Sequence, residues 1–152
     1  MAILNNTSED VMIYLQLNKK NGTTKWIGYE LKILSKKGEI TEEFLSLINS
    51  NELYFENFVE PEIPALCNAL DQIAKGEIQE FLFEPIDERD FRLELKHENG
   101  IISANIFLEE AQVLSNYQWN FYSMIGVRMK INKEDIETFS NQLKEEFKLI
   151  SE

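Results

Sequence analysis

Neighbouring carboxylates are the side chains of this chain with the clearest capacity for chemistry. Adjacent acids occur at Glu42 and Glu43, at Glu109 and Glu110, and within the segment 87–90 (DERD). Two carboxylates can act as acid and base in glycoside hydrolysis, but only at fixed separations across an aromatic cleft, which sequence does not reveal. A small hydrolase that uses surface carboxylates is therefore a minor alternative. We expect no catalytic residue and a protein that is not an enzyme.

The only histidine and the only cysteine, His97 and Cys67, indicate structural positions. No partner for a general base is indicated near His97, and Cys67 lies on the apolar side of a predicted helix, which favours a buried thiol. One histidine and one cysteine leave only carboxylates for a metal site, and no calcium loop of the DxDxDG kind is present. Motifs for esterases, dinucleotides and nucleotide phosphates are also absent from the sequence. We expect no cofactor and no metal.

Surface recognition is the remaining chemistry, because acids lie beside aromatic residues near predicted loops. One group surrounds the segment 54–60 and another surrounds the long connection after residue 108. Tyrosine and tryptophan are enriched in binding hot spots, and acids around them suit a basic partner. Phe55 and Trp119 are more often core residues than contacts. The predicted partner-binding residues are Glu109, Glu110, Tyr117, Tyr54, Glu56 and Glu60.

Net charge points to the same kind of partner. The 152 residues carry a formal charge of −12, so they repel nucleic-acid phosphates and attract a basic protein. No secretory signal and no long apolar stretch is present, which predicts a cytoplasmic protein without a membrane span. The length favours a single domain over 1–152, with 1–10 a flexible lead-in, and a monomer or weak homodimer.

The hairpin over 91–108 is the clearest structural element. Apolar and polar residues alternate on both sides of Asn99-Gly100, the strongest two-residue turn signal. A two-residue loop predicts a full register, and the two alternations then share one buried face. The predicted pairs are Glu98 with Ile101, His97 with Ile102, Leu95 with Ala104, Leu93 with Ile106 and Phe91 with Leu108.

Other segments show the same two-residue period. Strands are predicted over 11–17 and 26–34 as a first hairpin, and over 52–58, 78–85 and 119–131, with Gly126 a candidate for a bulge. Residues 41–49 have helical spacing, although a strand remains an alternative. Helices are predicted from a start between 61 and 64 to Gly76, and over 133–150, because apolar residues recur every three or four positions.

Together these elements predict an α+β fold. It has a mainly antiparallel sheet of about six to seven strands, which ends in a four-strand meander from residue 78 to residue 131. Two principal helices pack against the sheet.

Two stretches of the second half, FEPIDERDFRLELKHENGIISANIF and VRMKINKEDIETFSNQLKEEF, resemble the WapI-like immunity proteins of bacterial polymorphic and contact-dependent toxin systems. The similarity covers a Phe-x-Pro segment at 83–85, the alternating hairpin from Phe91 and a strand that leads into Asp135, Phe139 and Leu143 of the closing helix. The preceding helix from Glu62 to Leu70 fits the same order.

The resemblance implies a non-catalytic immunity protein that binds and neutralises the C-terminal domain of a cognate toxin. Such domains are often nucleases, whose basic surfaces suit an acidic inhibitor. No binding residue is carried over from the family, because the contacts vary with the toxin. The alternative from the residues alone is an acidic adaptor domain that binds a protein of an unrelated pathway.

Overall fold

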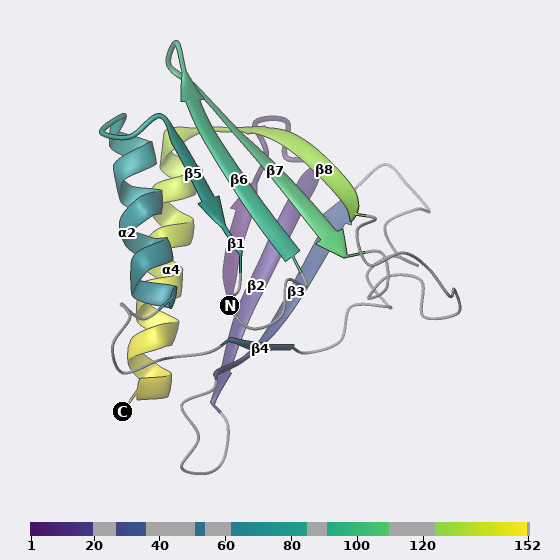
Figure 1. Cartoon of the computed structure of the whole chain (residues 1–152), viewed down its shortest axis with the longest axis vertical. Helices are drawn as coiled ribbons and strands as arrows, with labels where there is room; N and C mark the ends of the chain where they lie inside the picture. The colour runs from purple at the N-terminus through teal and green to yellow at the C-terminus, as the bar shows by residue number, and fades with distance from the viewer. Residues whose placement is uncertain (20–26, 36–50, 54–61, 85–90, 110–123, 152) are drawn as a thin grey trace.

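The computed structural model describes residues 1–19, 27–35, 51–53, 62–84, 91–109 and 124–151. Within these residues the strands form two four-stranded antiparallel sheets, ordered β1-β2-β3-β4 (sheet A) and β5-β6-β7-β8 (sheet B). The two sheets face each other, and two helices lie side by side along one flank of the pair (Figure 1). The elements are β1 (Ala2–Asn5), β2 (Val11–Lys19), β3 (Ile27–Ser35), β4 (Asn51–Leu53), α2 (Glu62–Lys75), β5 (Glu80–Phe83), β6 (Phe91–Glu98), β7 (Ile101–Glu109), β8 (Met124–Ile131) and α4 (Lys133–Ser151).

The α+β class, the antiparallel pairing and the C-terminal four-strand meander are confirmed. The strands are divided between two sheets, however, where the sequence suggested one. Alternation shows that one side of a strand is buried but does not show what covers it, so periodicity does not distinguish one sheet from two.

Sheet B follows the predicted register in full. Phe91 pairs with Leu108 and Glu98 with Ile101, with all intervening pairs as expected. Asn99 and Gly100 both have positive φ, 52° and 77°, which a tight turn of the I′ type requires. The turn and the alternation therefore specify the same arrangement.

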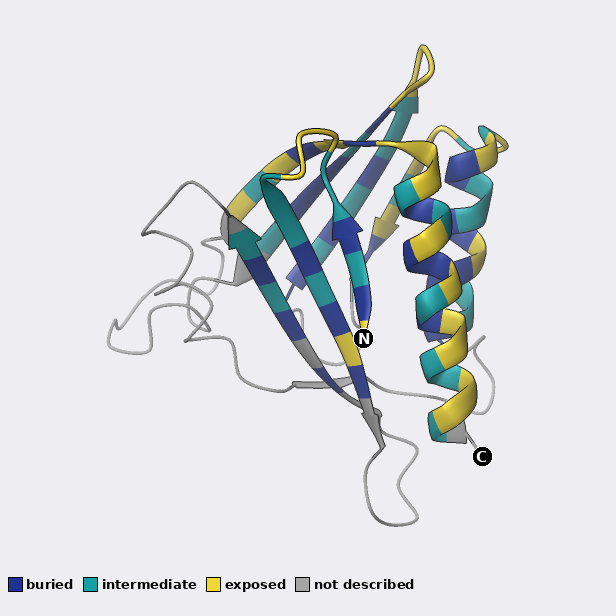
Figure 2. Ribbon diagram, turned by 180° about the vertical axis from the view of Figure 1, so that it is seen from behind, coloured by how far each residue is buried: buried dark blue, intermediate teal, exposed yellow. Residues whose placement is uncertain are grey.

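Sheet A is built on the first predicted hairpin. Ile13 pairs with Ile33 and Leu15 with Leu31, and all four side chains are buried. Figure 2 shows the resulting alternation of buried and more exposed residues along β2 and β3. β4 pairs with the start of β3. The remainder of the strand predicted over 52–58, and the segment 41–49, lie outside the described residues.

The first residues differ from the flexible lead-in predicted over 1–10. Ala2–Asn5 forms β1, which pairs with β2, and the side chains of Ala2 and Leu4 are fully buried. Helix α4 covers the outer edge of β1, where the Gln142 side-chain oxygen accepts a hydrogen bond from the Ile3 amide at 2.8 Å. Its alternation is too short to predict a strand. The segment is ordered by its pairing with β2 and its packing against α4.

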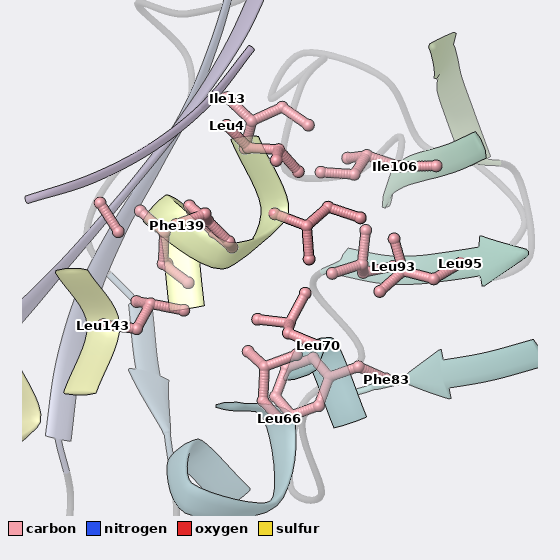
Figure 3. Close-up of a cluster of buried hydrophobic side chains, with 14 of the residues drawn as sticks. Leu4, Ile13, Leu66, Leu70, Phe83, Leu93, Leu95, Ile106, Phe139 and Leu143 are labelled. Carbon is pink, nitrogen blue, oxygen red and sulfur yellow. The ribbon is translucent and has the colours of Figure 1, made fainter. Parts of the chain in front are cut away.

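One hydrophobic core joins both sheets and both helices. Helix α4 packs on β1 and β2, α2 packs on β5 and β6, and the helices pack on each other. Figure 3 shows Phe139 of α4 on the side of Leu4 and Ile13 of sheet A, and Leu66 and Leu70 of α2 near Phe83 of sheet B. The predicted helices are confirmed, and Gly76 ends α2 with a φ of +73°.

The bulge predicted at Gly126 is wrong. β7 and β8 pair without interruption from Ile102 and Ile131 to Glu109 and Met124. Gly126 lies opposite Phe107, and a Cβ atom at residue 126 would lie only 2.5 Å from Phe107 Cδ1. The glycine therefore makes room for an aromatic ring, and the pairing with β7 continues along the curved strand β8 (Figure 1). Residues 119–123 of the long strand predicted there lie outside the described residues.

Candidate functional site

Of the six predicted partner-binding residues, only Glu109 belongs to the part of the chain that the structure describes. It is the last residue of β7, and its backbone pairs with Met124 at the start of β8. Glu110, Tyr117, Tyr54, Glu56 and Glu60 lie outside the described residues. The structure does, however, describe the strands that precede both acid–aromatic segments, β4 before 54–60 and β7 before 110–117. We call the ends of these strands the points of departure, and the described strands and helices the framework.

These two points of departure are close together. Asn51 of β4 pairs with Tyr29 of β3, and the Tyr29 ring makes an edge contact with the Phe91 ring at 5.5 Å between centroids. Phe91 in turn pairs with Leu108 of β7. With about 4.8 Å between neighbouring strands and about 10 Å between packed sheets, Asn51 and Leu108 lie roughly 20 Å apart. The first segment begins three residues after Asn51, and the second begins directly after Leu108.

A polar contact ties α2 to α4. Asp71 of α2 accepts hydrogen bonds from the Ser140 hydroxyl at 2.7 Å and from the Lys144 ammonium group at 2.5 Å. Burial alone would raise the pKa of the Asp71 carboxyl, but these hydrogen bonds and the charge of Lys144 outweigh burial and lower the pKa below its ordinary value. Ser140 is fully buried and thus held between the helices. The contact is structural, because the hydroxyl has no access to a substrate.

A groove of about 250 Å³ lies beside this contact, between α2 and α4. Ile63, Pro64 and Phe147 contribute apolar surface, and Cys67 also lines the groove. Burial raises the pKa of the Cys67 thiol to about 11, and the side chain is only 3% exposed. The prediction of a buried cysteine is therefore confirmed, and a buried thiol with a raised pKa is a poor nucleophile.

His97 holds the end of α2 against sheet B. Its Nδ1 atom lies 2.8 Å from the carbonyl oxygen of Ile73, in the last turn of the helix. A carbonyl oxygen only accepts, so Nδ1 carries the proton in this contact. The predicted pairing of His97 with Ile102 at the strand end is confirmed, and the His97 side chain is half-buried. The hydrogen bond to the helix could not be predicted, because it joins residues from separate elements.

A network on the outward side of sheet B was missed by the sequence reasoning. Asn105 of β7 donates to the Glu94 carboxylate at 3.3 Å and accepts from Nε of Arg128 on β8 at 2.8 Å. Arg92 of β6 contacts both Glu94 and Glu84. These residues occupy the polar positions of the alternation, which marks them only as facing away from the core. Their mutual contacts follow from the strand pairing.

Among the described residues no group of three or more histidine, cysteine or acidic side chains could hold a metal ion. Over the same residues, no helix has the length and apolar character needed to cross a membrane.

Comparisons with protein-family models, with curated proteins and with solved structures gave no match. The similarity to WapI-like immunity proteins stays a prediction from the sequence.

Proposed function

We propose that this protein is a cytoplasmic, non-catalytic immunity protein. It binds a cognate bacterial toxin domain, a basic nuclease, through the acidic and aromatic residues of 54–60 and 109–117, and so neutralises it. The observation that carries the proposal is the closeness of the two points at which these segments leave the framework. A standard interface covers about 800 Å² on each partner, a patch roughly 30 Å across, so one partner can contact residues near both points.

Charge supports a basic partner. The net charge of −12 attracts a basic domain over a distance comparable to the Debye length and raises the association rate. A nuclease must present basic residues to bind phosphates, so an acidic inhibitor that covers or adjoins that surface blocks the substrate.

The described apolar residues behind the family resemblance lie in the framework. Phe83, Phe91, Phe139 and Leu143 are all buried in the core. Their spacing therefore determines the fold and contributes nothing to a partner surface. This separation suits an immunity protein, because loop residues can change with the toxin while the core stays the same.

Neutralisation is tested by co-expression with the toxin domain encoded beside this gene. We expect cells that carry both proteins to grow and cells that carry the toxin alone to die. Death of cells that contain soluble, folded protein would contradict the immunity function. A large secreted toxin gene beside this one favours immunity, whereas an operon of metabolic genes favours the adaptor alternative.

The interface is tested by charge reversal at the β7 end. Glu109→Lys with Glu110→Lys should slow association with the toxin domain roughly tenfold and remove much of its salt dependence. The matched control is Glu77→Lys with Glu145→Lys, two exposed acids whose reversal changes the net charge equally. The control should change the rate about twofold or less, because only the long-range field is altered. Equal effects of the two variants would contradict a local interface.

Tyr117→Ala tests whether the Tyr117 ring slows dissociation of the complex without changing the association rate. An aromatic anchor at an interface contributes about 1 kcal/mol or more, mainly through the dissociation rate. We expect faster dissociation with little change in association, measured by surface plasmon resonance on a variant that melts like the parent. Unchanged dissociation would exclude Tyr117 as an anchor and direct attention to Tyr54, Glu56 and Glu60.

A further inference from the structure

Sheet B has an outward face that neither helix covers. In Figure 1 this sheet lies in front of sheet A, with α2 and α4 at its side. The strand pairing arranges the outward positions in three rows of four, one residue from each strand of the sheet. The rows are Glu80-Lys96-Ser103-Lys130, Leu82-Glu94-Asn105-Arg128 and Glu84-Arg92-Phe107-Gly126, where Glu84 directly follows β5 and contacts Arg92 at 2.6 Å. We call these twelve residues the outer face.

Charge on the outer face is divided between its two edges. The β5 edge carries Glu80 and Glu84, and the β8 edge carries Arg128 and Lys130. On β6 the charges of Arg92, Glu94 and Lys96 alternate, and the described outward side chains of β7 are uncharged. Lys96 forms an ion pair with Glu80 at 3.2 Å and Arg92 with Glu84 at 2.6 Å, so the acids of the β5 edge are partly neutralised within the chain. The β8 edge is positive, in a chain that is strongly acidic overall.

The basic edge has no acidic partner within the part of the chain that the structure describes. Arg128 donates through Nε to the side-chain oxygen of Asn105 at 2.8 Å, which orients the guanidinium group. Asn105 is only 8% exposed and is itself held by Glu94. Arg128 is thus an oriented cation at the protein surface. Lys130 lies two residues further along the same strand and is exposed.

Apolar groups accompany these charges. Leu82, in the row of Arg128, is 52% exposed on the β5 edge. Phe107 lies over Gly126, whose missing Cβ leaves room for the ring. An exposed leucine and an aromatic ring provide contact area between the charged edges.

We propose that the outer face is a self-complementary interface through which two copies of this chain form a dimer. A two-fold axis parallel to the strands, between β6 and β7, lays β8 of one copy over β5 of the other. Each positive edge then lies over a negative edge, twice by symmetry, as an isologous contact requires. The second copy is the partner that the charges favour, because it offers the matching pattern in the same register.

The axis pairs individual residues. Arg128 lies over Leu82 of the second copy, between Glu80 and Glu84 of that copy, and Lys130 lies over Glu80 of that copy. Arg92 lies over Phe107 of the second copy, an arrangement that favours a cation–π contact. No like charges are placed directly opposite one another. The alternative two-fold axis, perpendicular to the strands, lays β8 over β8 and would place Arg128 over Arg128 and Glu94 over Glu94.

The size of the face predicts a weak dimer. With rows about 6.7 Å apart and strands about 4.8 Å apart, the twelve residues cover roughly 400 Å² on each copy. A total of about 800 Å² is below the roughly 1,000 Å² expected of a stable interface, so the contact belongs to the weak and transient class. The dimer is therefore expected to form at high concentration and to weaken when salt screens its exposed charges.

A charge-exchange experiment tests the interface with the full chain. Arg128→Glu with Lys130→Glu makes the face acidic, and Glu80→Lys with Glu84→Lys makes it basic. For each variant alone, the dimer dissociation constant should be at least tenfold larger than the parent's. It is measured by sedimentation velocity over about 10 µM to 1 mM. An equimolar mixture of the two should form a heterodimer with a dissociation constant within about threefold of the parent's. Starting from −12, each double reversal changes the net charge by four, so both variants remain acidic overall and nonspecific attraction does not explain pairing.

Three results would overturn the proposal. These are a parent that stays monomeric at the highest concentration, variants that dimerise like the parent, and a mixture that fails to associate. Glu77→Lys with Glu145→Lys serves as the control away from the face and should leave the parent's dissociation constant within about threefold. Thermal melting of each variant verifies that the sheet is intact, and the mixture provides a readout that loss of folding could not produce.

Discussion

Gly126→Ala gives a direct test of the packing between β7 and β8. A Cβ atom at residue 126 would lie 2.5 Å from Phe107 Cδ1 and 2.8 Å from Phe107 Cε1, so the ring must move. The carbonyl oxygen of Ile106 lies 3.3 Å away and needs only a small adjustment. The clash is therefore with one side chain, and removal of that side chain should remove most of the cost.

Two opposing effects determine the sign. Alanine is favoured over glycine in a strand by about 0.5–1 kcal/mol, because glycine loses more conformational entropy on folding. Displacement of a packed ring costs about 1–3 kcal/mol. With Phe107 present, Gly126→Ala should lower the free energy of unfolding by about 1 kcal/mol. In a Phe107→Ala background the same change should be neutral or stabilising by up to about 0.5 kcal/mol.

Urea denaturation of the four proteins in this double-mutant cycle measures the effect. The coupling free energy between the two positions should be about 1–1.5 kcal/mol, with an unchanged dependence on urea concentration. If Gly126→Ala stabilises the protein while Phe107 is present, the ring does not lie on the glycine and the reasoning fails. A coupling near zero would have the same meaning.

Three further substitutions test contacts between elements. Asp71→Asn should lower stability at neutral pH by about 1 kcal/mol, because it removes the charged partner of Lys144. The pKa of Asp71 is lower in the folded protein than its unfolded value of about 3.9. The ionised carboxyl therefore stabilises the fold fully above the unfolded pKa, and this stabilisation is lost as the pH falls through the folded pKa. The free energies of unfolding of the parent and the variant should become equal in acid. A deficit that persists at low pH would contradict an ionic origin. Leu143 is fully buried, so Leu143→Ala should lower the free energy of unfolding, measured by urea denaturation, by about 2–5 kcal/mol. A loss below about 1 kcal/mol would show that α4 is not packed as described. His97→Ala should lower the free energy of unfolding by about 1 kcal/mol and speed amide hydrogen exchange in the last turn of α2, because the Ile73 carbonyl keeps only its bond from the Gly76 amide. Exchange raised equally in α4 would indicate a general loss of stability.

Local patterns predicted most of the framework. The Asn99-Gly100 turn and its flanking alternation determine the register of β6 and β7, because turn geometry and side-chain direction depend on adjacent residues. The recurrence of apolar residues every three or four positions likewise predicts α2 and α4, and Gly76 marks the end of α2. Cys67 falls on the apolar side of α2, so its burial also followed from the sequence.

The candidate surface could be predicted only in part. Acids next to aromatic residues suggested two segments, but their relation depends on Tyr29 and Phe91, which are far apart in the sequence and meet across the two sheets. The outer face was missed because the polar positions of β5 to β8 have ordinary composition when each strand is considered alone. Its two charged edges become apparent only when the strands are placed in their paired order.

The sequence by itself determined which side of each long strand and helix is buried, because that depends on a period within one element. Tertiary structure alone decided what covers each buried side. β1 is ordered by pairing with β2 and by Gln142 of α4, and the strands divide into two sheets whose facing sides share one core with the helices. The space at Gly126 and the contact of Asp71 with Ser140 depend in the same way on residues from other elements. A contact between distant residues stabilises the fold only after chain closure brings them together, so its energy leaves no periodic pattern in the sequence.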